Sequence, residues 1–229
     1  MVDVVRKDIK NLHLAVYPPS GRVRVAAPLR VNDEAVRLAV ISRLPWIKRQ
    51  KSKLKHQVRQ SEREYVTGES HYFQGRRYRL NVVTQSGKSL VAIRNKSTIE
   101  LFVNEFCDKA HRERVMLQWY RQQLNEQIPT FITHWERLMG VRVADWRLRK
   151  MKTKWGTCNI DAQRIWLNVE LAKKSSQCLE YIIVHEMTHL LERHHNDRFI
   201  KLMDEFMPQW RLYREELNHS PLASEHWDY

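Results

Sequence analysis

The stretch Val184–His189 reads Val-His-Glu-Met-Thr-His, and the interpretation of the whole chain starts from it. Residues four apart on an α-helix lie on the same face, one turn from each other. His185 and His189 can therefore direct imidazole nitrogens at one zinc ion. Glu186 follows the first histidine, so its carboxylate lies beside the ion and can accept a proton from a water that the metal activates. We predict a helix that binds zinc through these two histidines, with Glu186 as the catalytic base.

The residues around this motif are those of a buried helix. Leu179, Ile182, Ile183 and Leu190 flank it, and the pattern predicts a helix from about residue 176 to residue 192. An unpaired carboxylate at Glu186 would be costly in such a buried helix. The alternative, a core helix with two satisfied histidines, is therefore disfavoured.

A catalytic zinc ion usually has three protein ligands and one open position. His194 and His195 are the candidates for the third ligand, and on a continuous helix neither would face the metal. The helix must therefore break after about Leu191, with a new helix capped near Asn196. We favour His195 as the third zinc ligand, with His194 as the alternative.

The composition is that of an ordinary globular protein. The 229 residues are 42% hydrophobic and 29% charged, which excludes disordered and collagen-like chains. The longest strongly apolar run, near Tyr181–Val184, is far shorter than the roughly 20 residues of a membrane span. The charged residues 1–11 lack the apolar segment of a signal peptide. Three cysteines without CxxC spacing favour a reducing compartment, so we predict a cytoplasmic protein.

The net charge of +14 is distributed unevenly along the chain. Residues 1–150 carry 30 Lys and Arg against 14 Asp and Glu, whereas residues 151–229 carry 10 against 12. A basic excess favours an anionic partner such as nucleic acid, and the dense run of Lys and Arg from Lys48 to Arg63 is the best candidate surface. The simpler interpretation of this run is a solvated helix face.

The N-terminal two-thirds combine short strands with helices. Residues 13–17 and 23–25 predict a hairpin, and Asn32 or Asp33 can cap a helix that Pro45 splits before the basic run. Glycine-punctuated runs between Tyr65 and Val103 predict a small antiparallel sheet. A long helical segment begins at about residue 108. We expect Pro129 to restart a helix that ends at Gly140, and residues 141–143 to open a strand.

The last third contains a predicted hairpin formed by residues 154–158 and 164–168. Arg164–Asn168 is a candidate edge strand that holds an extended substrate by main-chain hydrogen bonds, with ordinary sheet core as the alternative. Trp155 and Gly156 are expected to form a tight structural corner rather than to touch substrate. Cys158 as a fourth metal ligand would close the site and abolish catalysis. A further helix is expected at about residues 196–206.

Several of these residues together resemble one protein family. The motif His185-Glu186-x-x-His189, with His195 and then Phe199 after it, is similar to that of the YgjP-like bacterial metallopeptidases, which are related to SprT-like and minigluzincin proteases. So are the Lys-x-x-Trp-Gly-Thr-Cys segment at residues 152–158 and the Leu-Asn pair at residues 167–168. The resemblance extends over nearly the full chain. It implies a zinc peptidase in which the third histidine at this spacing, here His195, is a ligand.

The predicted fold is α+β. The resemblance implies a minigluzincin-like peptidase core, in which an active-site helix carries the motif and an antiparallel sheet places its edge strand above the cleft. We divide the chain into a β-rich region with a basic helix at residues 1–107 and a helical, zinc-dependent metallopeptidase core at residues 108–229.

The predicted function is a cytoplasmic zinc metallopeptidase that cleaves protein or peptide substrates. Two alternatives stay open. The first, suggested by the resemblance, is a metal-dependent pyrophosphatase acting on a nucleoside triphosphate such as UTP, although a P-loop pattern and a carboxylate cluster for Mg²⁺ are both missing. The second is a nucleic-acid-associated protease or binding module. Candidates for the group that stabilises the oxyanion are Arg198, Tyr213 and His219.

Overall fold

The computed structural model describes residues 2–17, 21–56, 63–151 and 154–219, with the side chains of residues 53–56 and 219 excepted. The chain forms two compact units, of which the second runs from Arg63 to Ser220 and the first includes Met1–Glu62. The boundary expected between residues 107 and 108 is therefore corrected to one near Glu62. The physical reason is that Leu80 and Leu101 of the 63–107 segment share one hydrophobic core with Leu124 and Ile183.

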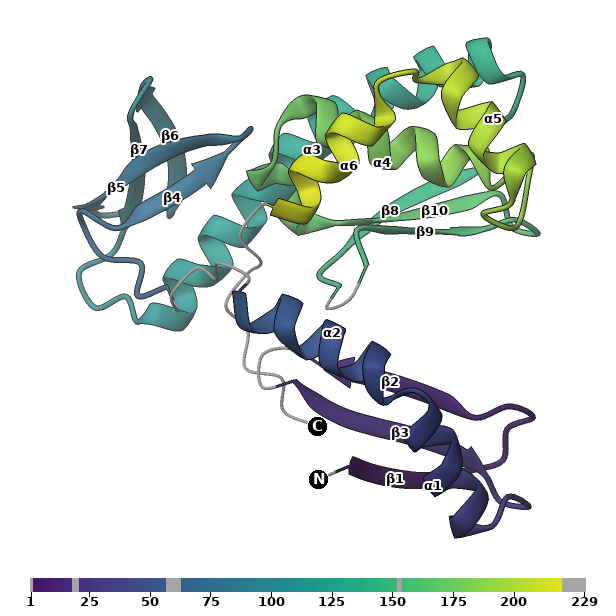
Figure 1. Cartoon of the computed structure of the whole chain (residues 1–229). Coiled ribbons are helices and arrows are strands. Elements are labelled where there is room, and N and C mark those ends of the chain that lie inside the picture. Colours follow the sequence, from purple (N-terminus) through teal and green to yellow (C-terminus); the bar gives the residue numbers. More distant parts are fainter. Residues whose placement is uncertain (1, 18–20, 57–62, 152–153, 220–229) are drawn as a thin grey trace. The chain divides into compact units, whose positions relative to one another are not determined.

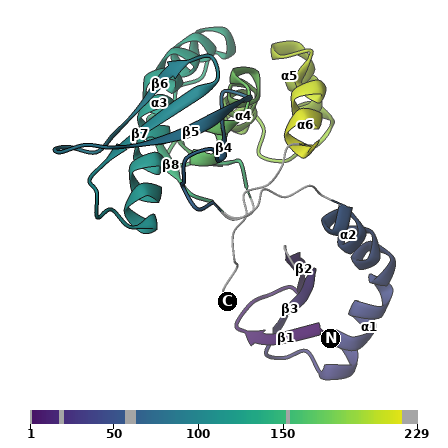
Figure 2. The same cartoon turned by 90° about the vertical axis from the view of Figure 1, so that its left-hand side faces the viewer.

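The first unit is a three-stranded sheet with two helices on one face (Figure 2). It contains β1 (Val2–Lys7), β2 (His13–Tyr17), β3 (Arg22–Pro28), α1 (Asp33–Ser42) and α2 (Leu44–His56). The antiparallel pairing of β2 with β3 confirms the predicted hairpin. The strand β1 was not expected from its charged sequence, and it pairs in parallel with β3.

The first helix of this unit begins at its predicted cap, and the helical segment divides near Pro45 as predicted. The side chain of Asn32 accepts the backbone N–H of Ala35 at 2.8 Å and caps α1. The helical segment divides at Arg43, just before Pro45. Lys48, Arg49 and Lys51 of the basic run are exposed on α2, whereas the side chains of residues 53–56 and the whole of residues 57–62 lie outside the described part.

The second unit begins with a four-stranded sheet in the order β4-β5-β7-β6. Its strands are β4 (Ser70–Phe73), β5 (Arg76–Thr84), β6 (Leu90–Asn95) and β7 (Thr98–Val103). The expected strands are present, but the sheet is mixed rather than antiparallel. The strand β7 turns back from β6 and lies between β6 and β5, which makes it parallel to β5.

A single helix, α3 (Lys109–Met139), follows this sheet and contains Pro129 in its interior. The expected restart at Pro129 is wrong. Leu124 and Ile128 before the proline and Ile132 after it are buried in one core, and this packing keeps the helix continuous despite the missing backbone N–H. The helix ends at Gly140, as predicted, because glycine adopts the left-handed conformation there at φ +65°.

A three-stranded sheet lies next to the motif helix. It has the order β8-β10-β9, with β8 (Asp145–Arg149), β9 (Gly156–Asn159) and β10 (Arg164–Asn168). The hairpin of β9 and β10 is as expected. The strand expected at residues 141–143 begins instead at Asp145. The prediction that residues 164–168 form an edge strand is also wrong, because β8 pairs in parallel with the other side of β10 and makes it the central strand.

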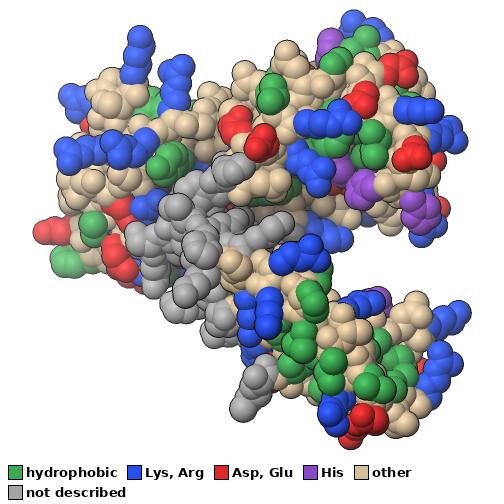
Figure 3. Space-filling view, viewed as in Figure 1, with side chains coloured by type: hydrophobic (Ala, Val, Ile, Leu, Met, Phe, Trp, Pro, Cys, Tyr) green, Lys and Arg blue, Asp and Glu red, His purple; other side chains and the backbone are tan. Residues whose placement is uncertain are grey.

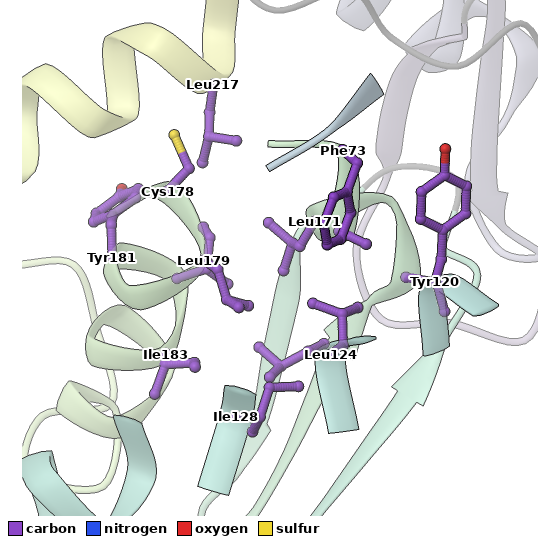
Figure 4. Packing of buried hydrophobic residues seen from close by; sticks show 14 of the residues in the cluster. Phe73, Tyr120, Leu124, Ile128, Leu171, Cys178, Leu179, Tyr181, Ile183 and Leu217 are labelled. Carbon is purple, nitrogen blue, oxygen red and sulfur yellow. The ribbon is translucent and has the colours of Figure 1, made fainter. Parts of the chain in front are cut away.

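The chain ends with the 3-10 helix η1 (Val169–Lys173) and the helices α4 (Ser176–Thr188), α5 (Asp197–Phe206) and α6 (Trp210–His219). The helix α4 lies over the β8-β10-β9 sheet and packs against α3, α5 and α6 (Figure 1). In Figure 4, Leu179 and Ile183 of α4 face the core formed with Leu124 and Ile128 of α3. The α+β class is therefore confirmed. Within the described residues, every helix is too short or too polar to cross a bilayer.

Candidate metal centre

The helix α4 is held rigidly in the core of the second unit. The hydroxyl of Ser175 accepts the backbone N–H of Cys178 and caps its first turn. Ile183, Val184 and Met187 are fully buried on the core side. Because this packing fixes the rotation of the helix about its axis, the remaining face, with His185 and His189, is turned toward a cleft.

The structure brings His185, His189 and His195 together. One possible ligand atom from each of the three residues lies within 4.8 Å of the other two, and the Nε2 atoms of His185 and His195 are 3.0 Å apart. Two imidazole nitrogens bound at 2.0–2.1 Å to a tetrahedral zinc ion are about 3.3 Å apart. The donor set therefore fits a zinc ion.

The third histidine reaches the cluster because α4 stops early. The helix ends at Thr188, three residues before the expected break, and the Thr188 carbonyl accepts the N–H groups of Leu191 and Glu192. The chain then turns back, and Asn196 caps α5 by accepting the N–H of Phe199 at 3.0 Å, as predicted. His194, the alternative ligand, stays outside the cluster and is exposed.

Hydrogen bonding and packing orient the rings of the cluster. The Nδ1 atom of His189 lies 3.1 Å from the Glu192 carbonyl, and a donor at Nδ1 leaves the Nε2 lone pair free for a metal. The centre of the Phe199 ring lies 4.7–5.0 Å from the centres of all three imidazole rings, so the phenyl ring packs against the whole cluster. The Nδ1 atom of His185 is buried without a hydrogen-bond partner among the described residues.

The surroundings favour neutral imidazoles. Burial lowers the pKa of His185 to about 3, with further lowering by His189 and His195. Burial also lowers the pKa of His189. A metal binds the neutral imidazole, so these rings are kept in the form that a metal requires.

Glu186 lies beside the histidines and is 5% exposed. Burial raises its pKa to about 8, and the positive charge of Lys154 partly opposes this rise. The carboxylate lies against Gly156, where an added Cβ would stand 2.6 Å from Oε1 of Glu186. Because Gly156 has no side chain, it leaves the space that the Glu186 carboxylate occupies.

The histidines and Glu186 line a cleft of about 930 Å³. Its walls come from the edge strand β9 and the residues around it, from α4 and the turn after it, and from α6. Figure 3 shows histidine side chains at the surface of the second unit, with basic and acidic side chains beside them. A groove with an edge strand on one wall suits an extended peptide.

Of the three sequence candidates for oxyanion stabilisation, two lie outside this cleft and the third lies outside the described side chains. Arg198 and Tyr213 do not line it, and the side chain of His219 lies outside the described residues. Cys158 lines the cleft but is not part of the histidine cluster, and burial raises the pKa of its thiol to about 11.

Sequence reasoning missed two residues of the cleft wall, Tyr181 and Arg214. Tyr181 precedes His185 by one helical turn, and its ring meets that of His185 edge-on at 5.9 Å, so the four-residue spacing could have found it. Arg214 comes from α6, and no local signal in the sequence connects it with the motif.

One comparison with known proteins assigns this chain to a family. The family described as YgjP-like, metallopeptidase domain, matches residues 10–220. The chain belongs to the YgjP-like metallopeptidases. This YgjP-like protein is therefore a hydrolase of the metallopeptidase class, and a peptidase acts on proteins or peptides. The predicted contact with nucleic acid has no support from the family match.

Two further comparisons add little to the assignment of the YgjP-like chain. The crystal structure of the metallopeptidase zymogen of Pyrococcus abyssi abylysin is similar to it with 17% sequence identity and a TM-score of 0.37. The similar region covers 39% of this chain and 90% of abylysin. A search of the curated proteins found no match.

Proposed function

We propose that this protein is a zinc-dependent peptidase in which His185, His189 and His195 hold the zinc ion and Glu186 is the general base. The observation that carries the proposal is the convergence of three histidines within 4.8 Å, next to a buried carboxylate, in an open cleft. The three free cysteines fit a reducing compartment, and we propose a cytoplasmic location.

Each residue has a defined task in this proposal. A zinc ion held by the three histidines would supply Lewis-acid chemistry and would lower the pKa of water to about 7. Glu186 removes a proton from the attacking water and then delivers it to the leaving amine. Gly156 leaves room for the carboxylate, and Phe199 holds the imidazole rings in place.

The edge strand β9 is the wall against which we propose that the substrate binds. One edge of β9 pairs with β10. The strand β9 lines the cleft, together with the residues that precede and follow it in the chain. An extended peptide can add to the unpaired side of such a strand through main-chain hydrogen bonds. The role expected of residues 164–168 therefore passes to residues 156–159.

The test is Glu186→Gln in the full-length, zinc-loaded protein. We expect zinc binding close to that of the parent and a loss of about 10²–10⁴-fold in kcat on an unfolded protein substrate, because the proton acceptor is removed. Unchanged turnover in this variant would contradict the proposal. A parallel assay on nucleoside triphosphates, with the same variant as control, measures the phosphoanhydride alternative.

A further inference from the structure

Three basic side chains line the cleft around the histidines. Lys154 immediately precedes Trp155 and β9, Arg193 lies in the turn after α4, and Arg214 projects from α6. The three residues thus come from three different walls. All three are exposed, and none forms an ion pair with another residue in the described part of the chain.

The acidic residues of the cleft do not balance these charges. Glu186 is buried and belongs to the proposed catalytic centre. The Glu192 side chain is only 14% exposed, accepts the backbone N–H of His194 at 3.2 Å and lies 3.9 Å from Arg198. Among the described lining residues, Asp161 is the remaining acid. The exposed wall of the cleft therefore carries more positive than negative charge.

Two of the basic residues flank the centre from different walls. Lys154 lies just before β9 and Arg214 lies on α6, and both line the cleft that also contains Glu186 and His185. A peptide bound in this cleft beside the histidines would therefore lie close to both charges.

Arg214 is supported by an aromatic stack. Its guanidinium lies 5.8 Å from the centre of the Trp210 ring. The Trp210 ring stacks on Tyr181, with 6.2 Å between the ring centres and 16° between the planes, and Tyr181 contacts His185. An arginine that rests on an aromatic face keeps its charge and still presents N–H donors to a ligand.

Unpaired cations in a cleft attract anionic ligands and repel cationic ones. The zinc ion would add to the positive potential, since its three ligands are neutral imidazoles. A lysine or arginine in a bound peptide would therefore meet like charges, whereas an aspartate or glutamate would gain ion pairs with arginine or lysine.

We propose that the cleft selects peptides with an acidic side chain next to the scissile bond, and that Arg214 and Lys154 are the specificity-determining residues that pair with it. This inference rests on the proposed peptidase function and names its substrate class. The test uses matched sets of quenched fluorescent peptides. Within a set the sequence is the same except for one residue next to the scissile bond, which is Asp, Asn or Lys. One set varies the residue before the bond and the other varies the residue after it.

With the full-length, zinc-loaded enzyme we expect kcat/KM to fall in the order Asp, Asn, Lys, with about a fivefold step from Asp to Asn, the scale of one exposed ion pair. Raising the salt concentration to 0.5 M should reduce this Asp-to-Asn step.

Arg214→Gln and Lys154→Gln should each lower the Asp-to-Asn ratio of kcat/KM, and Arg214→Glu should shift the preference toward the Lys peptide. Arg137→Gln, at an exposed position of α3 outside the cleft, makes the same change in net charge and should leave the ratio unchanged.

The outcomes separate this inference from the proposed function. Equal cleavage of the three peptides, or a ratio that Arg214→Glu does not alter, would overturn the acidic preference and leave the peptidase proposal standing. Failure of the zinc-loaded enzyme to cleave any of the peptides or an unfolded protein would overturn the peptidase proposal itself.

Discussion

Gly156 of β9 and Glu186 of α4 are in such close contact that a Cβ atom on Gly156 would stand 2.6 Å from Oε1 and 2.7 Å from Cγ of Glu186. Real Cβ atoms do not approach other atoms so closely, so any other residue at position 156 must displace the carboxylate. The contact joins the edge strand of the cleft to the proposed general base. The glycine therefore determines where the base lies.

The first prediction concerns this contact. Gly156→Ala should lower kcat by at least about tenfold, because a displacement of the base by about 1 Å is enough to lose much of its effect. Zinc binding should stay near that of the parent, since the three histidines are not displaced. Steady-state kinetics and metal analysis of the same preparation measure both quantities. A variant with full kcat would show that the carboxylate does not need this position.

The two adjacent histidines after the motif offer a matched pair. His195→Asn should weaken zinc binding by more than about 100-fold. Losing a residue that only hydrogen-bonds to a metal ligand already lowers metal affinity by about 10–100-fold, and losing the ligand itself should cost more. His194→Asn should bind zinc as the parent does, since His194 lies outside the histidine cluster. Competition with a chelator of known affinity measures both. The reverse order of affinities would assign the third ligand to His194.

Asn168 ties the segment before β9 to the central strand. Its buried amide donates to the carbonyl groups of Met151 at 2.7 Å and Lys154 at 2.9 Å. Asn168→Ala should lower the free energy of unfolding by about 1–3 kcal/mol, because it leaves these carbonyls without their donor. Denaturant unfolding measures the loss. Asn159→Ala removes an exposed amide from the same sheet and should cost clearly less.

A pH effect on stability is expected from His71. This histidine is 4% exposed, its Nε2 lies 2.9 Å from Oε2 of Glu69, and burial lowers its pKa below the usual 6.5. Above pH 6.5 the ring is neutral in both states, so it adds no pH dependence. Below pH 6.5 the unfolded chain binds a proton that the folded protein does not, and the free energy of unfolding falls until the pH reaches the folded pKa.

The corresponding variant is His71→Gln. Between pH 7.5 and pH 5.5 it should lose less stability than the parent, by up to about 1 kcal/mol per pH unit below 6.5. His134→Gln removes an exposed histidine from the same unit and should keep the parent's pH dependence. Equal slopes for the parent and His71→Gln would contradict the buried, neutral state of this histidine.

Local patterns were enough to identify much of this protein. The spacing of His185 and His189 places both rings on one helical face, and the capping residues Asn32 and Asn196 mark helix starts through hydrogen bonds within three residues. Gly140 ends α3 for an equally local reason, its positive φ. These features depend on neighbours in the chain, and their predictions held.

Features that depend on distant residues could not be read in this way. The position of β10 in the centre of its sheet depends on its pairing with β8, and the continuity of α3 through Pro129 depends on the core around Leu124 and Ile132. The approach of Gly156 to Glu186 and the position of Arg214 in the cleft join elements that are far apart in the chain. Hydrophobic packing and strand pairing act between segments without regard to their separation in sequence. The motif thus predicted a metal-dependent hydrolase from the sequence alone. Only the tertiary structure determined which strand and which cationic side chains surround the motif.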